Sequence, residues 1–230
     1  SSYATCQKIG LKMDRIIQVP DAVFINEETK FTVACEEAGA TIIGASEKLR
    51  VALNLNYNIE NPENWETFTQ NLEDGLRALN ASQPLEIHTL PMQSQFNPDN
   101  DYKTLAAFRQ RIPEIEVHLH RPESYCDVAD IIANCDLLLS ERLHALVIAA
   151  IVGKPFLALM YDVKVRELVS MLEMEDYALD VNHPFDPDAV KTGVEALQSA
   201  YDTVGAHLRS RSCTLNANLE DYFRTLKTQL

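Results

Sequence analysis

A strand, a turn and a buried helix follow one another in the stretch Asp136-Leu-Leu-Leu-Ser140-Glu-Arg142-Leu-His144-Ala-Leu-Val-Ile-Ala-Ala-Ile-Val-Gly153-Lys-Pro155. Ser140 belongs to the residue types that cap the amino ends of helices, and Gly153 followed by Pro155 is a typical helix stop. Between them the apolar side chains recur at helical spacing and leave no polar face, so a helix over 141–152 is predicted to be buried on all sides. A strand that leads into a buried helix is the repeating unit of a parallel α/β sheet.

The same alternation of short apolar runs and amphipathic segments extends along the middle of the chain. Runs rich in Val, Ile, Leu or aromatic residues predict strands at 49–56, 85–90, 115–119, 136–139, 156–159 and 177–181. The segments between them predict helices at 64–80, 102–112, 124–133, 141–152, 163–172, 186–209 and 215–226. Six strands with helices between them predict the α/β class and a doubly wound, Rossmann-like parallel sheet, whose ligands bind beyond the carboxyl ends of the strands.

The first part of the chain does not follow this pattern. Residues 1–45 combine a short helical start, a predicted strand at 15–19 and a polar stretch. Two interpretations stay open: this segment is the tail of an N-terminal domain, or it is an edge extension of the same sheet. We expect 46–213 to form the Rossmann-like domain and 214–230 to form a C-terminal helix.

Composition restricts the function and the compartment. The 34 acidic side chains against 20 basic ones give a formal net charge of −14, which argues against nucleic acid as a partner and leaves room only for a small, local anion site. The longest apolar stretch, 143–160, is interrupted by Gly-Lys-Pro too early to span a membrane. The start of the chain does not resemble a secretion signal, so we expect a cytoplasmic protein.

Cysteines and histidines give little indication of a metal. The five cysteines are widely spaced without a CxxC pair, which indicates reduced, mainly buried thiols and neither a disulfide framework nor a zinc site. His118 and His120 lie on one face of a predicted strand, but the sequence shows no third ligand, so a structural role is favoured. The sequence therefore predicts neither a metal nor a cofactor.

The first turn of the helix at 141–152 is a candidate anion site. An arginine at this end opposes the helix dipole and costs some tenths of a kcal/mol, about 0.3–1, unless an anion is also present. The free amides of the turn, Arg142 and His144 converge where a phosphate or a carboxylate can bind. The alternative is that Arg142 pairs with Glu141 or Asp136, while His144 is a satisfied histidine of the core.

The next junction between a strand and a helix repeats this arrangement in Tyr161-Asp162-Val-Lys164. Asp162 is a plausible N-cap, which puts Lys164 close to a second helix start. If the two strands are neighbours, Arg142, His144 and Lys164 can reach one dianion. Alternatively, Lys164 is a solvated surface lysine. In the loop at 91–101, Gln93, Gln95 or Asp101 can contact sugar hydroxyls, or Asp101 caps the following helix.

These motifs resemble those of the polysaccharide pyruvyl transferases. That family has an Arg-Leu-His-Ala helix, a Gly-x-Pro turn and a Tyr-Asp-x-Lys loop, and 142–145, 153–155 and 161–164 match them in order and spacing. The resemblance extends more loosely to Asp21-Ala-Val-Phe24, where Ala22 replaces the usual proline. Family members have two domains that form a glycosyltransferase-B-like cleft. The resemblance implies that this chain supplies the second, donor-binding half and begins near the end of the first domain.

The resemblance also implies a reaction. A pyruvyl transferase moves the pyruvyl group of phosphoenolpyruvate onto a sugar of a cell-surface polysaccharide or its precursor, forms a cyclic ketal and releases phosphate. His144 is the candidate catalytic residue that transfers a proton, although it can instead hydrogen-bond the phosphate. The implied substrate-binding residues are Ser140, Arg142, Leu143, Tyr161 and Lys164. The expected partners are phosphoenolpyruvate and a sugar acceptor, which a lipid can carry, and a homo-oligomer stays open.

Two other functions remain compatible with the sequence. The first is a nucleotide-sugar glycosyltransferase or epimerase of similar architecture, which also binds a diphosphate at a helix start. The chain has seven glycines and no GxGxxG motif, which speaks against that class. The second is a non-catalytic binding module that keeps the fold.

Overall fold

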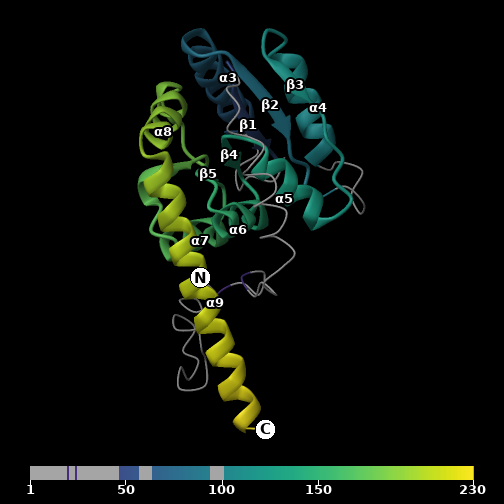
Figure 1. Cartoon of the computed structure of the whole chain (residues 1–230). Coiled ribbons are helices and arrows are strands. Elements are labelled where there is room, and N and C mark those ends of the chain that lie inside the picture. Colours follow the sequence, from purple (N-terminus) through teal and green to yellow (C-terminus); the bar gives the residue numbers. More distant parts are fainter. Residues whose placement is uncertain (1–19, 21–23, 25–46, 57–63, 94–100, 230) are drawn as a thin grey trace.

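One parallel sheet organises the chain (Figure 1). A computed structural model describes residues 20, 24, 47–56, 64–93 and 101–229. Within them six strands lie in the order β3-β2-β1-β4-β5-β6, and every neighbouring pair is parallel. The strands are β1 (Leu49–Asn54), β2 (Leu85–Thr89), β3 (Glu116–His118), β4 (Leu137–Ser140), β5 (Phe156–Met160) and β6 (Ala178–Asp180). The predicted α/β class and doubly wound sheet are confirmed.

The helices agree with the predictions except near the end of the chain. They are α3 (Trp65–Ser82), α4 (Asp101–Arg111), α5 (Tyr125–Ala133), α6 (Leu143–Val152), α7 (Val163–Met171), α8 (Asp188–Ser199) and α9 (Tyr201–Gln229). The single helix predicted at 186–209 is wrong, because the chain breaks at Ala200, and the helix predicted at 215–226 continues α9. The cause is tertiary: α8 packs against α3 and α9 packs against α6, so the chain turns between two packing partners.

The segment 1–45 and its predicted strand lie outside the described residues, apart from Pro20 and Phe24. The Phe24 side chain is buried in the same hydrophobic core as the sheet. The division of the chain at 45 and 213 stays a prediction, although α9 runs without a break through residue 213.

Helix α6 lies at the centre of the packing. The side chains from Ala145 to Ala150 are fully buried, and α6 contacts α5, α7 and α9 as well as β4 and β5. The prediction of a helix buried on all sides is therefore confirmed for this central segment. Because such a helix offers no lateral face to water, its polar groups can meet a ligand only at its ends.

The carboxyl end of α6 depends on two glycines. Gly153 has a φ of 67°, the left-handed conformation that ends a helix at low cost only in a residue without a Cβ. A Cβ on Gly153 would lie 2.9 Å from the carbonyl oxygen of Gly205 in α9. A Cβ on Gly205 would lie 2.8 Å from the carbonyl oxygen of Gly153. The two helices therefore approach backbone to backbone at this point.

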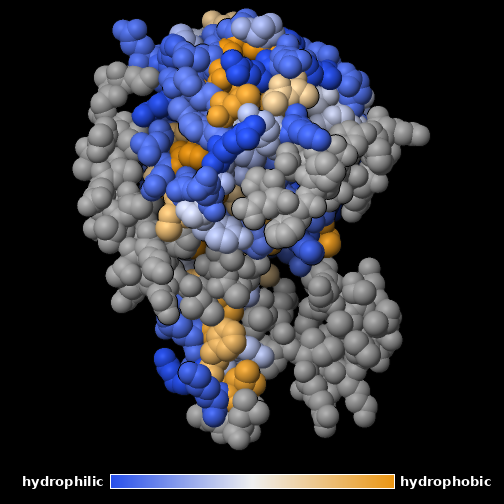
Figure 2. Space-filling view, turned by 90° about the vertical axis from the view of Figure 1, so that its right-hand side faces the viewer, coloured by the Kyte–Doolittle hydropathy of each residue, from blue (hydrophilic) through white to orange (hydrophobic). Residues whose placement is uncertain are grey.

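Helix α9 covers α6 and then continues past the body of the domain (Figure 1). Its first part buries Val204 and Leu208. Its last part leaves Phe223 and Leu226 exposed, and Figure 2 shows apolar surface on the section of the molecule that extends away from the sheet. Across the described ranges, no helix is both long and apolar enough to cross a membrane.

Three of the five cysteines are described, and all three are free thiols. Cys135 is buried as predicted, whereas Cys126 and Cys213 are exposed, so the prediction of mainly buried thiols is wrong for these two.

The contact between the two glycines leads to a stability prediction. We expect Gly153→Ala to lower the free energy of unfolding by about 2–4 kcal/mol, because the new Cβ adds left-handed strain and a backbone clash. Urea unfolding followed by circular dichroism measures the change. Ser210→Ala, at an exposed position of α9, is the control and should leave the midpoint within about 0.5 kcal/mol. Equal stability of the Gly153→Ala protein would contradict this account.

Candidate functional site

The candidate site lies where β1 and β4 end side by side. The chain leaves β1 toward β2 and leaves β4 toward β5, so the two connections diverge here. In doubly wound sheets, ligands bind beyond the carboxyl ends of the strands at such a switch point. Asn54 ends β1 and is in register with Ser140, which ends β4. Both side chains are fully buried. Buried polar groups need hydrogen-bond partners, and here those partners form one network.

Asn54 is the centre of this network. Its Nδ2 group donates to the carbonyl oxygen of Leu90 at 2.7 Å and to Oδ2 of Asp101 at 3.2 Å. Its Oδ1 atom accepts from the backbone amide of Arg142 at 3.1 Å and from Oγ of Ser140 at 3.2 Å. One side chain therefore joins the ends of β1, β2 and β4. Asn54 is not among the predicted site residues, although a polar residue at the end of an apolar strand is a signal visible in the sequence.

Arg142 is held by a buried carboxylate from another element. Its Nε donates to Oδ2 of Asp101 at 3.1 Å and its Nη2 donates to Oδ1 at 2.6 Å, which is a bidentate ion pair. Asp101, only 1% exposed, also accepts from the amide of Met92 at 3.0 Å. Gln93 Oε1 accepts from the same Nη2 at 3.0 Å. Asp101 therefore orients Arg142 and is not the helix cap proposed from the sequence.

Arg142 forms an ion pair with a carboxylate, as the alternative interpretation required, but the partner is Asp101 and neither Glu141 nor Asp136. Asp136, one of the two expected partners, pairs with Arg50 at 2.9 Å instead. The Arg142 side chain keeps 23% of its surface exposed. No described residue forms a hydrogen bond with its Nη1 group. Asp101 and Gln93 thus engage Nε and Nη2, and among the described residues Nη1 is the guanidinium nitrogen left for a ligand.

The amino end of α6 differs from the prediction. Ser140 is not its N-cap, because this residue is paired in the sheet and its hydroxyl is engaged by Asn54. Arg142 is the N-cap and its side chain makes no capping hydrogen bond. Leu143 begins the helix and packs against the core as a half-buried side chain. The predicted start at Glu141 is therefore two residues early.

His144 lies in the first turn of α6, directly after Leu143. Its side chain is half-buried, so it is not sealed in the core as the alternative interpretation required. Its position beside Arg142 in the chain puts an imidazole at the same helix end as the guanidinium. Its role as a proton donor or a phosphate ligand stays a prediction.

The second predicted loop lies next to the first, because β4 and β5 pair in parallel. Asp162 is the N-cap of α7, as predicted, and its Oδ1 accepts from the amide of Val165 at 2.9 Å. Tyr161 is half-buried and interacts electrostatically with Arg142; burial and the neighbouring Asp162 raise the pKa of its hydroxyl. Lys164 is exposed, and no ion-pair partner for it is found in the described part of the chain. Arg142 and Tyr161 are thus brought together.

A second buried carboxyl group lies behind this network. Glu141 is fully buried, and its Oε2 accepts from the backbone amide of Asn56. Its Oε1 atom and both polar atoms of the Asn56 side chain have no hydrogen-bond partner among the described residues. Burial raises the pKa of Glu141 to about 8, so the group is mostly protonated at pH 7. The sequence suggested Glu141 only as a partner for Arg142, and not as a buried, protonated carboxyl group.

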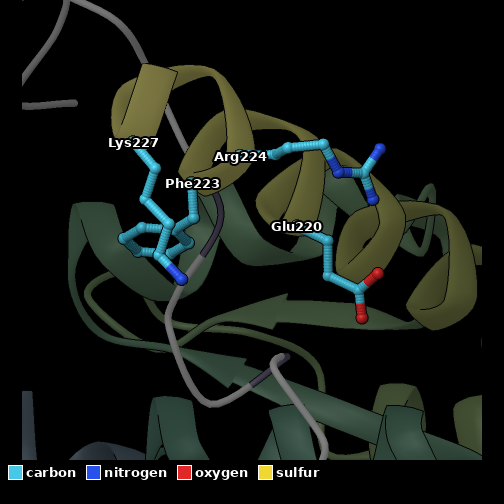
Figure 3. A pocket seen from close by; sticks show the side chains of 4 residues that line it. All are labelled: Glu220, Phe223, Arg224 and Lys227. Carbon is cyan, nitrogen blue, oxygen red and sulfur yellow. The ribbon is translucent and has the colours of Figure 1, made fainter. Parts of the chain in front are cut away.

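A hollow on α9 does not compete with this site. Figure 3 shows its lining, which consists of Glu220, Phe223, Arg224 and Lys227. All four belong to one helix, and the hollow is open to solvent. Side chains from a single helix face do not enclose a ligand, so this hollow lacks the concave form of a substrate site.

Comparison with known families gives a direct assignment. The family model described as polysaccharide pyruvyl transferase matches residues 1–163. This chain belongs to the polysaccharide pyruvyl transferase family. The match includes Asn54, Asp101, Arg142, His144 and Tyr161, and it stops one residue before Lys164. A search of curated protein sequences finds no match.

Solved structures with the same architecture are distant in sequence. The UDP-GlcNAc 2-epimerase from Neisseria meningitidis bound to UDP-GlcNAc aligns over 99% of this chain and 59% of its own, with 15% identity and a TM-score of 0.60. The S. aureus MnaA–UDP structure aligns over 91% and 51%, with 14% identity and a TM-score of 0.54. EarP, the protein that glycosylates an arginine of elongation factor EF-P, aligns over 91% and 82%, with 14% identity and a TM-score of 0.53.

These similarities support a glycosyltransferase-B-like fold for the pyruvyl transferase chain, as predicted. The chain spans between half and three fifths of the length of the Neisseria meningitidis and S. aureus proteins. At such low identity, the likeness concerns the fold alone.

The ion pair of Asp101 and Arg142 leads to a second prediction. We expect Asp101→Asn to lower the free energy of unfolding by about 2–3 kcal/mol, because it leaves a largely buried guanidinium without its counter-charge. A double-mutant cycle with Arg142→Gln should give a coupling energy of about 1–3 kcal/mol. Asp180→Asn is the matched control, since it removes an exposed pair with Arg166 and should cost less than about 1 kcal/mol. A coupling energy near zero would contradict the pairing.

The raised pKa of Glu141 predicts a pH dependence of stability. The folded state binds a proton on Glu141 up to about pH 8, whereas the unfolded chain releases it near 4.5. Stability from this group is therefore fully present below about pH 4.5 and is lost as the pH rises toward 8, by about 1.4 kcal/mol per pH unit. Glu141→Gln should remove this slope. Chemical denaturation at several pH values between about 5 and 8 measures the slope of the free energy of unfolding against pH. The same slope in the Glu141→Gln protein would contradict this prediction.

Proposed function

We propose that this chain supplies the donor-binding part of an enzyme that transfers the pyruvyl group of phosphoenolpyruvate onto two hydroxyls of a sugar. One observation carries the proposal: the Arg142 guanidinium is fixed at the switch point of the sheet, and none of the described residues engages its Nη1 group. Membership of the polysaccharide pyruvyl transferase family supports the transferase class. The donor, the sugar acceptor and the cell-surface polysaccharide as its destination belong to the proposal.

Phosphoenolpyruvate offers two anionic groups that suit this site. A guanidinium binds a carboxylate or a phosphate through two parallel N–H groups. Asp101 already occupies Nε and Nη2 of Arg142, so a donor binds through Nη1 or replaces Asp101. In the first case Asp101 keeps the guanidinium oriented and leaves Nη1 for the donor. The planar geometry explains why lysine would be a poor substitute at this position.

A neutral ion pair alone does not attract a dianion, so other groups must supply positive potential. The amino end of α6 presents backbone amides and the positive end of the helix dipole. Lys164, in the first turn of α7, provides a mobile charge one strand away. We assign to Lys164 the second anionic group of the donor and to Tyr161 a hydrogen bond at the rim of the site. Ser140 and Leu143 position the turn that carries Arg142.

His144 is the candidate for proton transfer. A proton added to the methylene carbon of phosphoenolpyruvate creates an oxocarbenium-like centre, which one sugar hydroxyl attacks. Loss of phosphate regenerates such a centre, and attack by the second hydroxyl closes the cyclic ketal. The two attacking hydroxyls release two protons: one replaces the proton given to the methylene carbon, and the other leaves with the phosphate. A single imidazole can therefore give one proton and take one back.

The nucleotide-sugar alternative has weaker support. It rests on the fold similarity to structures solved with UDP-GlcNAc or UDP, at 14–15% identity. Calorimetric titration separates the two proposals: we expect the protein to bind phosphoenolpyruvate and not UDP. Binding of UDP alone would support the nucleotide-sugar function, and binding of neither would support a non-catalytic module.

Variants separate the roles at the site. We expect His144→Gln to lower turnover by about 10²–10⁴-fold with little change in donor affinity, as for a lost general acid or base. Lys164→Ala should chiefly raise the KM for phosphoenolpyruvate. Phosphate release in the presence of an acceptor sugar measures both effects.

The neighbouring Arg166→Ala is the matched control for charge, because Arg166 is exposed and pairs with Asp180. Arg166→Ala should leave both the turnover and the KM for phosphoenolpyruvate unchanged. If His144→Gln raises KM and keeps turnover, His144 is a phosphate ligand and another group supplies the proton. Full activity of both site variants would rule out the proposed residues.

A further inference from the structure

A cluster of imidazole and carboxylate groups lies on the two strands at the other edge of the sheet. Glu86 and His88 of β2 are in register with Glu116 and His118 of β3. In a strand, alternate residues share a face, so these four side chains lie on one face, whereas the buried Ile87 points to the other. We call Glu86, His88 and His118 the β2–β3 cluster.

The donor atoms of the β2–β3 cluster have the spacing of metal ligands. Glu86 Oε1 lies 3.0 Å from Nε2 of His88 and 3.2 Å from Nε2 of His118. The three ligand atoms all lie within 4.8 Å of one another. Ligands that surround a zinc ion tetrahedrally at bonds of about 2.0–2.1 Å are themselves about 3.3 Å apart. An ion can therefore enter with only small side-chain movements.

His118 shows why hydrogen bonding alone does not account for this geometry. Its Nε2 atom is 3.2 Å from Oε1 of Glu86 and also 3.2 Å from Oε1 of Glu116. This nitrogen is shielded from solvent, yet it makes no hydrogen bond with either carboxylate. A ring nitrogen that faces two carboxylate oxygens without a bond is suitably placed for a cation between them.

His120 provides the supporting contact that metal-binding histidines usually have. Its Nε2 lies 2.9 Å from Nδ1 of His88, and its backbone amide donates to Oγ1 of Thr89 at 3.0 Å. A hydrogen bond at Nδ1 fixes the ring of His88 so that its Nε2 faces Glu86. The rings of His88 and His120 are stacked with centroids 5.2 Å apart, which holds both in place.

We propose that Glu86, His88 and His118 bind one zinc ion, which ties the edge strand β3 to β2. Two imidazoles and one carboxylate without a thiolate are ligands that suit zinc, whereas Mg²⁺ and Ca²⁺ prefer oxygen ligands alone. The side chains are between 20% and 41% exposed, so an ion can enter from solvent and a water molecule can complete its coordination. The site is independent of the proposed transfer reaction.

The cluster could not be recognised from the sequence alone. His118 and His120 form a visible pair, but the other two ligands come from β2, about thirty residues earlier along the chain, and only strand pairing brings them together. His120 then acts as a supporting residue and His88 as the ligand.

Metal binding by the purified protein tests the proposal. After removal of metals with a chelator, calorimetric titration with Zn²⁺ should show one site per chain, and zinc should raise the melting temperature. His118→Ala and Glu86→Gln should each weaken zinc binding at least 10-fold. Glu86→Gln is nearly isosteric, so it separates ligand loss from misfolding, which circular dichroism checks.

His183→Ala is the matched control, because His183 is an exposed histidine outside the β2–β3 cluster, and it should bind zinc as the parent protein does. Cobalt(II) substitution locates the ion independently: a thiolate charge-transfer band would place it on a cysteine and overturn the proposal. Undetectable zinc binding, or binding that both cluster variants retain in full, would also overturn it.

Discussion

The complete burial of α6 is the constraint on which the rest of the structure depends. Its central residues, Ala145 to Ala150, have no exposed surface, so every lateral contact of the helix is made with another element. The carboxyl end of α6 is closed by the contact of Gly153 with Gly205. Only the amino end is left to carry polar chemistry, and the sheet order puts this end at the switch point between β1 and β4. The packing of α6 thus determines where on the protein a ligand can bind. The side chains at its amino end determine which ligand binds there.

The polar network at this point serves both stability and binding. Asn54, Asp101 and Arg142 come from the end of one strand and the starts of two helices, and their hydrogen bonds leave little freedom for the guanidinium. A buried ion pair is a weak source of stability because desolvation offsets much of the attraction. Its benefit here is orientation: a carboxylate 41 residues away in the chain sets the direction in which Nη1 of Arg142 points. A flexible arginine would lose more conformational entropy when it binds a ligand.

Sequence patterns predicted the sheet and most helices because those features depend on local periodicity. The doubly wound fold, the buried α6 and the Asp162 cap all follow from residues near one another in the chain. The predictions were wrong where the structure at a residue depends on a partner far away in the chain. Ser140 is of a residue type that often caps helices, but here it is paired in the sheet and its hydroxyl bonds to Asn54. Ala200 separates α8 from α9 because these two helices pack on different partners. The partner of Arg142 was missed for the same reason, since Asp101 approaches only after β1, β2 and β4 assemble.

The ion pair between Asp101 and Arg142 also bears on how fast an anionic ligand reaches the site. Because the pair is neutral, it adds little long-range attraction, and the whole chain with its formal charge of −14 repels an anion. The diffusional encounter of a dianion is therefore slowed by the field of the protein, and dissolved ions screen this field over about 10 Å at 0.1 M. Association should therefore become faster as ionic strength rises from low values. Asp101 thus fixes the orientation of the Arg142 guanidinium, but it also cancels the charge that would attract an anion from a distance.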